Sequence, residues 1–100
     1  MDKYIEKCTN LEEFRQMLDT IDYKIVMLLE QREEIVERIA KYKKNTQISI
    51  IQKEREEYMM KKLEENSKES RLDKNFLRDI FTRIIEESKK KQEGVINDIS

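Results

Sequence analysis

Apolar residues recur every three or four positions through most of this 100-residue chain, the spacing that predicts amphipathic helices. The first such run begins at Leu11 and meets no helix-breaking residue before about Lys44. It predicts one helix of roughly 33 residues, about 50 Å long. Two pairs just before and inside this run fit the capping box that begins a helix: Thr9 with Glu12, and Asn10 with Glu13.

Two shorter apolar runs follow, separated by polar segments that are poor in helix formers. The expected elements after the first helix are connectors at 45–49 and 66–70, and helices at 51–65 and from 72 or 73 to about 92. With no proline and one glycine, the chain is expected to be all-α, with one long and two shorter helices. The domain organisation expected is a flexible lead at 1–9, a helical domain at 10–93 and a frayed tail at 94–100, with Gly94 as the stop signal.

The first helix is longer than the fold that this chain would make alone. A 100-residue domain is only about 30 Å across, so a 50 Å helix extends beyond it. The apolar stripe continues along the extension and has to be covered. The pattern therefore predicts an intertwined helical homodimer.

Charge and composition exclude several classes of function. Charged residues make up 43% of the chain but the net charge is −1, which argues against nucleic-acid binding and against a membrane-surface helix. No apolar run approaches the ~20 residues that span a bilayer, and the N-terminus lacks the apolar stretch of a signal peptide. Cys8 is the only cysteine, so an internal disulfide is impossible and a cytoplasmic location is expected.

The chain contains no histidine. That excludes Ser-His and Cys-His nucleophilic systems, histidine general acid–base catalysis and histidine-ligated metals. We expect no metal and no cofactor. Any catalysis would have to use Arg, Lys, Glu, Gln and Ser side chains.

Three cations on the first predicted helix are candidates for binding an anion. Arg32 and Lys43 lie eleven residues apart, which is close to three full turns, so they share a face and are separated by roughly 16 Å. Two long basic side chains can hold a small dianion across that gap. Arg15 lies seventeen residues before Arg32, which places it about 25 Å from Arg32 along the helix axis and roughly 100° around the helix. If Arg15 binds a ligand, it is expected to do so in a second site or in a partner chain's site.

The two shorter helices carry further polar candidates. Gln52, Arg55 and Glu56 share one face of the second helix. Ser88 and Gln92 follow the apolar stripe of the third helix, where hydrophobic residues are expected. Together with Arg32 and Lys43, these residues would suit a water-excluding pocket for a small dicarboxylate.

Each of these residues also has a purely structural interpretation when it is considered alone. Arg32 and Lys43 can be surface cations, and the 52–56 face can be solvated. Ser88 can be a small core residue and Gln92 a fraying helix end. The run Lys89, Lys90 and Lys91 is interpreted as a solvated helix end, favourable near a helix C-terminus.

The ordered set of these residues closely resembles the all-α, type II chorismate mutase family. The resemblance covers about residues 10–93 without an insertion. The segments that carry it are residues 14–22, 28–32, Lys43, 53–56, 81–88 and Gln92. It implies an intertwined dimer with two equivalent sites. It also implies a cofactor-free Claisen rearrangement of chorismate to prephenate, on the route to phenylalanine and tyrosine.

The resemblance also implies a role for each candidate residue. Arg15 would reach into the partner chain's site to bind a substrate carboxylate. Arg32 would bind a carboxylate in its own chain's site, with help from Ser88. Lys43 and Gln92 would hydrogen-bond the ether oxygen whose bond breaks.

The remaining candidates would surround the ring of the substrate. Arg55 and Glu56 would line this side, with Glu56 accepting a hydrogen bond from the ring hydroxyl. Gln52 departs from the family pattern, because many members have an acidic residue at this position. An amide can still hydrogen-bond a hydroxyl, so we expect activity to survive the change.

Two other functions remain open from the sequence. A sibling activity on the same scaffold, an isochorismate pyruvate lyase that forms salicylate, would use much the same cations. The other alternative is a non-catalytic helical dimer that regulates or assembles another enzyme. The Ser88 and Gln92 side chains argue against this last alternative, because a pure scaffold has no need for them on its buried stripe.

Overall fold

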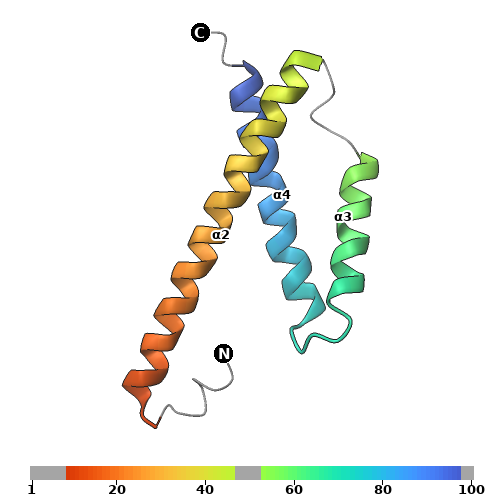
Figure 1. The fold of residues 1–100 in the computed structure, drawn as a ribbon. Helices are drawn as coiled ribbons and strands as arrows, with labels where there is room; N and C mark the ends of the chain where they lie inside the picture. Colours follow the sequence, from red (N-terminus) through yellow and green to blue (C-terminus); the bar gives the residue numbers. More distant parts are fainter. Residues whose placement is uncertain (1–8, 47–52, 98–100) are drawn as a thin grey trace. The chain divides into compact units, whose positions relative to one another are not determined.

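The computed structural model describes residues 9–46 and 53–97. In these two segments the structure has three helices and no strand: α2 (Leu11–Thr46), α3 (Lys53–Asn66) and α4 (Lys74–Asn97) (Figure 1). The all-α prediction of one long and two shorter helices is therefore confirmed. None of the three helices is long and apolar enough to cross a membrane.

The chain divides into two compact units, and the boundary follows Glu34, inside α2. In the first unit, α2 is capped by the second of the two pairs that the sequence offered: the backbone N–H of Glu13 donates to Asn10 Oδ1 at 2.9 Å. The Glu13 carboxylate accepts a hydrogen bond from the backbone N–H of Thr9, also at 2.9 Å. The first bond satisfies an N–H group that the first turn of a helix leaves without a partner, and the second ties the preceding residue to that turn.

The first unit exposes much of its apolar stripe when the chain is alone. Leu18 is 58% exposed and Leu28 is 63% exposed, and other large apolar side chains of this part of α2 are similarly open to solvent. Scattered exposed apolar residues are ordinary, but these follow one another along a single helix.

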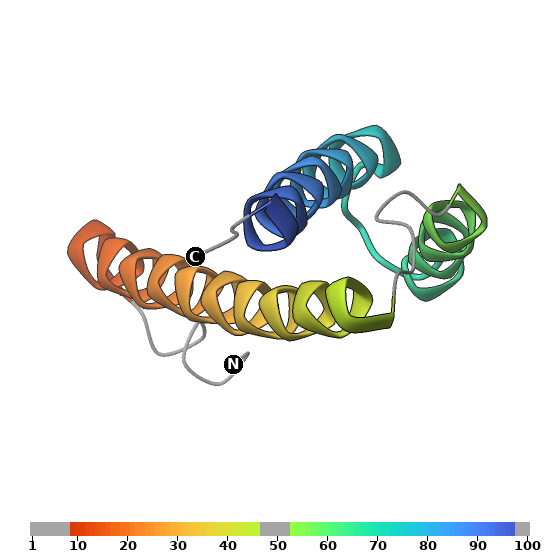
Figure 2. The same cartoon turned by 90° about the horizontal axis from the view of Figure 1, so that it is seen from above.

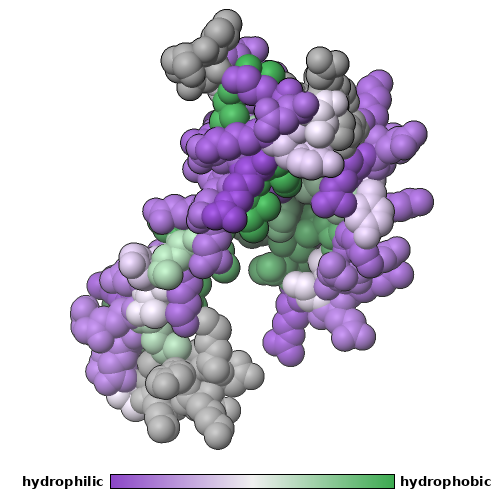
Figure 3. Space-filling view, turned by 45° about the horizontal axis from the view of Figure 1, so that its top comes forward, coloured by the Kyte–Doolittle hydropathy of each residue, from purple (hydrophilic) through white to green (hydrophobic). Residues whose placement is uncertain are grey.

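The second unit contains the last turns of α2 together with α3 and α4. Figures 1 and 2 show the end of α2 beside the C-terminal half of α4, while α3 runs alongside α4. Val36 and Ala40, one turn apart on α2, are the buried apolar residues among those described. The space-filling view shows apolar surface in this unit surrounded by polar side chains (Figure 3).

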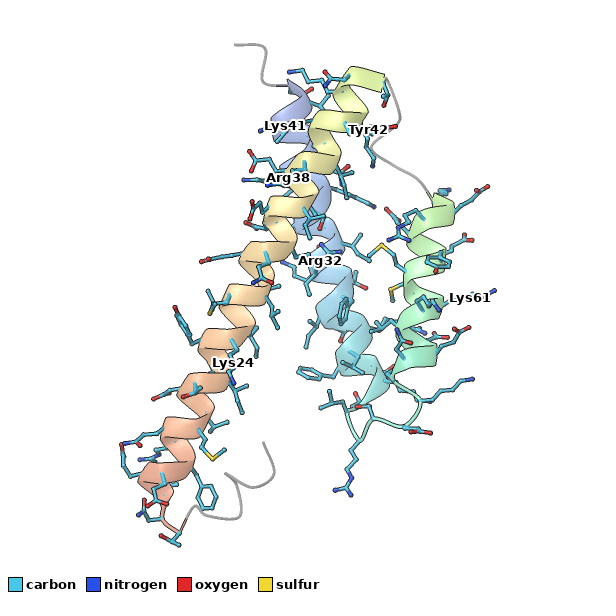
Figure 4. All side chains as sticks on the ribbon, viewed as in Figure 1. Lys24, Arg32, Arg38, Lys41, Tyr42 and Lys61 are labelled. Carbon is cyan, nitrogen blue, oxygen red and sulfur yellow. The ribbon has the colours of Figure 1, made fainter. Side chains whose placement is uncertain are left out.

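The α3–α4 hairpin is fixed by local polar contacts. Asp73 caps α4, because its Oδ2 accepts a hydrogen bond from the backbone N–H of Phe76 at 3.0 Å. Arg78 of α4 pairs with Glu64 of α3 at 2.6 Å. Lys61 projects from α3 away from α4 and plays no part in this contact (Figure 4).

Two predicted helix ends are wrong. Asn45 and Thr46 belong to α2 rather than to a loop, and the Thr46 hydroxyl donates to the Tyr42 carbonyl one turn earlier at 2.8 Å. α4 continues through Gly94 to Asn97. A glycine ends a helix by adopting a left-handed φ, which Gly94 does not do, and its cost inside a helix is only about 1 kcal/mol.

Candidate functional site

The best-defined polar contact of the second unit joins α2 to α4. Lys43 Nζ donates a hydrogen bond of 2.8 Å to Gln92 Oε1. Gln92 is 9% exposed and is the one buried polar residue among those that the structure describes. The sequence placed both side chains in one site, and the structure brings them into direct contact.

This contact orients the Gln92 amide. Because Oε1 accepts from Lys43, the opposite end of the amide, its NH₂ group, is the part that can donate to a ligand. The lysine and the amide therefore present N–H donors from two helices to the same place. Two donors that converge in this way can stabilise an oxygen atom of a ligand that gains negative charge during a reaction.

Burial changes the acidity of Lys43. Desolvation lowers its pKa from the ordinary lysine value of 10.5, because a partly buried ammonium group loses hydration. A poorly hydrated cation interacts more strongly with an anionic ligand than a fully hydrated one does. This environment distinguishes Lys43 from a surface lysine.

Ser88 lies one helical turn before Gln92 on α4 and is half-buried. Its hydroxyl donates to the Ile84 carbonyl at 2.9 Å. The predicted hydroxyl on the α4 stripe is therefore in place, next to the amide of the same helix.

Glu56 of α3 has a partner that the sequence analysis missed. Its Oε1 lies 2.5 Å from Lys89 Nζ of α4, and both side chains are about one-third exposed, at 31% and 32%. The interpretation of Lys89 as part of a solvated helix end is therefore wrong, although Lys90 and Lys91 are exposed. The spacing contained the signal, because Lys89 follows Ile85 by four residues and so continues the apolar face of α4.

Arg55 is exposed, and its guanidinium lies 5.3 Å from the ring centre of Tyr58, a cation–π geometry. Both residues border a hollow of about 270 Å³ between α3 and α4, whose apolar lining includes Met59, Phe81 and Ile85. Arg55 thus brings a positive charge to the edge of an apolar surface.

That these side chains form a substrate site stays a prediction, and for three of the predicted residues so does their position relative to Lys43. Arg15 and Arg32 lie on α2 in the first unit, so their sharing a pocket with Lys43 stays a prediction. Gln52 lies outside the described residues. Residues 9–46 and 53–97 hold no group of three carboxylate or thiol side chains able to bind a metal ion.

Comparison with known proteins gives a family for this arrangement. Residues 14–93 match the family model described as chorismate mutase type II. The chain is 32% identical over 88 residues to a protein of Methanocaldococcus jannaschii named chorismate mutase, which covers 88% of this chain and 89% of that protein.

Two bifunctional proteins, both named chorismate mutase/prephenate dehydratase, are similar over part of their length. The one from Buchnera aphidicola of Schizaphis graminum is 35% identical over 88% of this chain, and the one from Buchnera aphidicola of Acyrthosiphon pisum is 39% identical over 75% of it. The chain spans only 23% and 20% of these two relatives. No solved structure matches the chain.

Proposed function

The chain belongs to the type II chorismate mutase family, and from this premise we propose that it catalyses the rearrangement of chorismate to prephenate. The observation that carries the proposal is the hydrogen bond between Lys43 and the buried Gln92. It joins a cation and an amide donor on neighbouring helices. Groups of these two kinds can stabilise the negative charge that grows on the ether oxygen of chorismate as its bond breaks.

The proposed reaction is intramolecular. The ether C–O bond of chorismate breaks while a new C–C bond forms, so every atom of the substrate is kept and no proton leaves or enters. The protein has to hold the enolpyruvyl side chain over the ring and stabilise the negative charge that grows on the ether oxygen. This chemistry fits a chain without histidine.

Lys43 and Gln92 would supply the second of these effects. The Lys43 ammonium would donate one hydrogen bond to the ether oxygen and the Gln92 NH₂ group another. Because the pair is already in contact before substrate binds, little reorganisation is needed during the reaction. Preorganised donors of this kind each contribute about 10²–10³-fold in rate.

The two carboxylates of chorismate would be bound by arginines. Arg32 would hold one of them, with the Ser88 hydroxyl beside it, and Arg15 of a second copy would hold the other. A bidentate pair between guanidinium and carboxylate fixes both position and orientation. Arg55, Glu56 and Gln52 would line the ring side, with Glu56 accepting from the ring hydroxyl.

This assignment requires a homodimer. α2 has 36 residues, which at 1.5 Å per residue is about 54 Å, and it exposes its apolar stripe in the isolated chain. Pairing with a second copy would cover that stripe and deliver Arg15 to the other chain's site. A dimeric mass in solution is therefore part of the proposal.

The shared site can be tested by mixing two inactive variants. In a mixed dimer of Arg15→Ala with Lys43→Met, one site receives the native Arg15 and Lys43, and the other receives neither. Refolding equal amounts together should restore about a quarter of the native activity, because half of the dimers are mixed and each has one complete site. A mixture as inactive as its components would exclude a site shared between chains.

The activity itself is tested by supplying chorismate and isochorismate separately to the purified chain and identifying the products. Prephenate from chorismate is the expected result. Salicylate and pyruvate from isochorismate alone would assign the chain to the lyase activity instead. Loss of neither substrate would reject both enzymatic assignments and favour a non-catalytic helical dimer.

A further inference from the structure

Lys89 differs from the two lysines that follow it. Its side chain is 32% exposed and pairs with Glu56 across the α3–α4 interface, whereas Lys90 is 67% exposed and pairs with Glu87 of its own helix at 3.6 Å. Lys89 thus contacts a neighbouring helix, as a lysine at a solvated helix end does not. Its position therefore calls for a role beyond solubility.

The contact ties Glu56 to α4, the helix that carries Ser88 and Gln92. Lys89 directly follows Ser88 and lies three residues before Gln92, so it is a neighbour of Gln92 on the helix surface. Its ammonium engages Oε1 of Glu56. Among the described residues, Lys89 is the ion-pair partner of the Glu56 carboxylate. The second oxygen of that carboxylate, Oε2, can accept a hydrogen bond from a ligand.

We propose that Lys89 is a positioning residue that holds the Glu56 carboxylate toward the substrate's ring hydroxyl. This inference rests on the proposed function. By binding Oε1, the ammonium restricts rotation of the carboxylate and directs Oε2 as a hydrogen-bond acceptor. A glutamate without this partner would sample several rotamers and pay for its ordering when substrate binds.

The pair is poorly explained as a stabilising contact alone. Partly exposed ion pairs contribute little to folding, and the Arg78–Glu64 pair already joins α3 to α4 near their connecting turn. A hydrophobic residue at position 89 would continue the apolar face of α4 equally well. The lysine is therefore better explained by what it does to Glu56.

This role predicts a particular kinetic signature. A hydrogen bond to the ring hydroxyl exists in both the bound substrate and the transition state, so weakening it raises KM and leaves kcat nearly unchanged. We expect Lys89→Met to raise KM about five-fold, the scale on which a partly exposed ion pair acts. Lys89→Arg should restore KM to within about two-fold of native, because a guanidinium can still reach the carboxylate.

The matched control is Lys90→Met. It removes the same charge one residue away, so it corrects for any general loss of attraction between the protein and a dianionic substrate. The second control is Glu56→Gln. If Lys89 acts through Glu56, then Lys89→Met should cause no further increase in KM in a chain that already carries Glu56→Gln.

The experiment measures kcat and KM for chorismate with the native chain, these single variants and the double variant, and confirms by circular dichroism that each is folded. A KM increase specific to Lys89→Met, rescued by arginine and absent in the Glu56→Gln background, supports the proposal. Equal KM values for Lys89→Met and Lys90→Met overturn the proposal. So does a double variant whose KM rises above that of Glu56→Gln by the same factor as Lys89→Met alone raises it. A native chain that leaves chorismate unchanged rejects the proposed function as well.

Discussion

Replacing Lys43 with methionine is the most informative single perturbation of the proposed site. Methionine keeps much of the length and the apolar stem of lysine and removes the ammonium group. The change deletes the proposed donor to the ether oxygen. It also removes the hydrogen bond of 2.8 Å from Lys43 Nζ to Gln92 Oε1, which orients the Gln92 amide.

The expected loss in rate follows from these two effects. Removing one preorganised donor costs about 10²–10³-fold in kcat, or about 3–4 kcal/mol of barrier. Because the Gln92 amide then loses the contact that directs its NH₂ group, the loss should lie at the upper end of this range. Both kcat and kcat/KM should fall, since the donor acts chiefly on the transition state.

Folding should change much less than catalysis. The lost hydrogen bond leaves the Gln92 carbonyl oxygen without its partner, a cost of about 1–3 kcal/mol. Removing the ammonium also ends its desolvation, the cause of the lowered Lys43 pKa, and this offsets part of the cost. A net change of ~1 kcal/mol would lower the thermal midpoint by about 4–8 °C.

The assay follows chorismate consumption by the native chain, Lys43→Met and the control Lys41→Met. Lys41 lies two residues earlier on α2, is 65% exposed and pairs loosely with Glu37 at 3.7 Å, so its loss should leave kcat/KM within about two-fold of native (Figure 4). A folded Lys43→Met variant that keeps more than about a tenth of native kcat would refute the role given to Lys43.

Three further predictions test the chemistry, the fold and the assembly. Because desolvation lowers the Lys43 pKa and only the protonated form carries the positive charge that stabilises the ether oxygen, kcat/KM measured against pH should decline on the alkaline side at a pH below 10.5; a decline at or above that value would contradict the assignment. Asp73→Ala removes the cap of α4 and should lower the free energy of unfolding by about 1 kcal/mol in urea titration, with kcat/KM of the folded protein unchanged. Leu18→Glu changes a side chain that is 58% exposed in the single chain, so it should leave the fold of a monomer intact, reduce the mass measured by light scattering to that of one chain and abolish activity. An unchanged mass would argue against this dimer surface.

The helices were predictable from sequence because each is an amphipathic pattern that extends over several turns. Their ends were harder to place. Gly94 permits a helix end without requiring one, and α4 continues past it to Asn97. Thr46 was assigned to a loop by its low helix propensity, yet its hydroxyl bonds back to Tyr42 inside α2.

The contacts between helices were less predictable than the helices themselves. The α4 pattern singled out Gln92, because a polar residue on a buried stripe is unusual. That Lys43 donates to Gln92 depends on how the end of α2 lies against α4, which the periodicity of neither helix determines. Lys89 was predicted to be solvated because two further lysines follow it in the sequence. Its ion pair with Glu56 of α3 shows that it lies at the interface between helices.

The central claim is that this chain by itself converts chorismate to prephenate. The measurement that tests it most directly is the amount of prephenate formed from excess chorismate by a small amount of purified chain, with no other protein present. We expect many equivalents of prephenate per chain, far faster than in buffer alone. Chorismate that disappears only at its uncatalysed rate would contradict the claim.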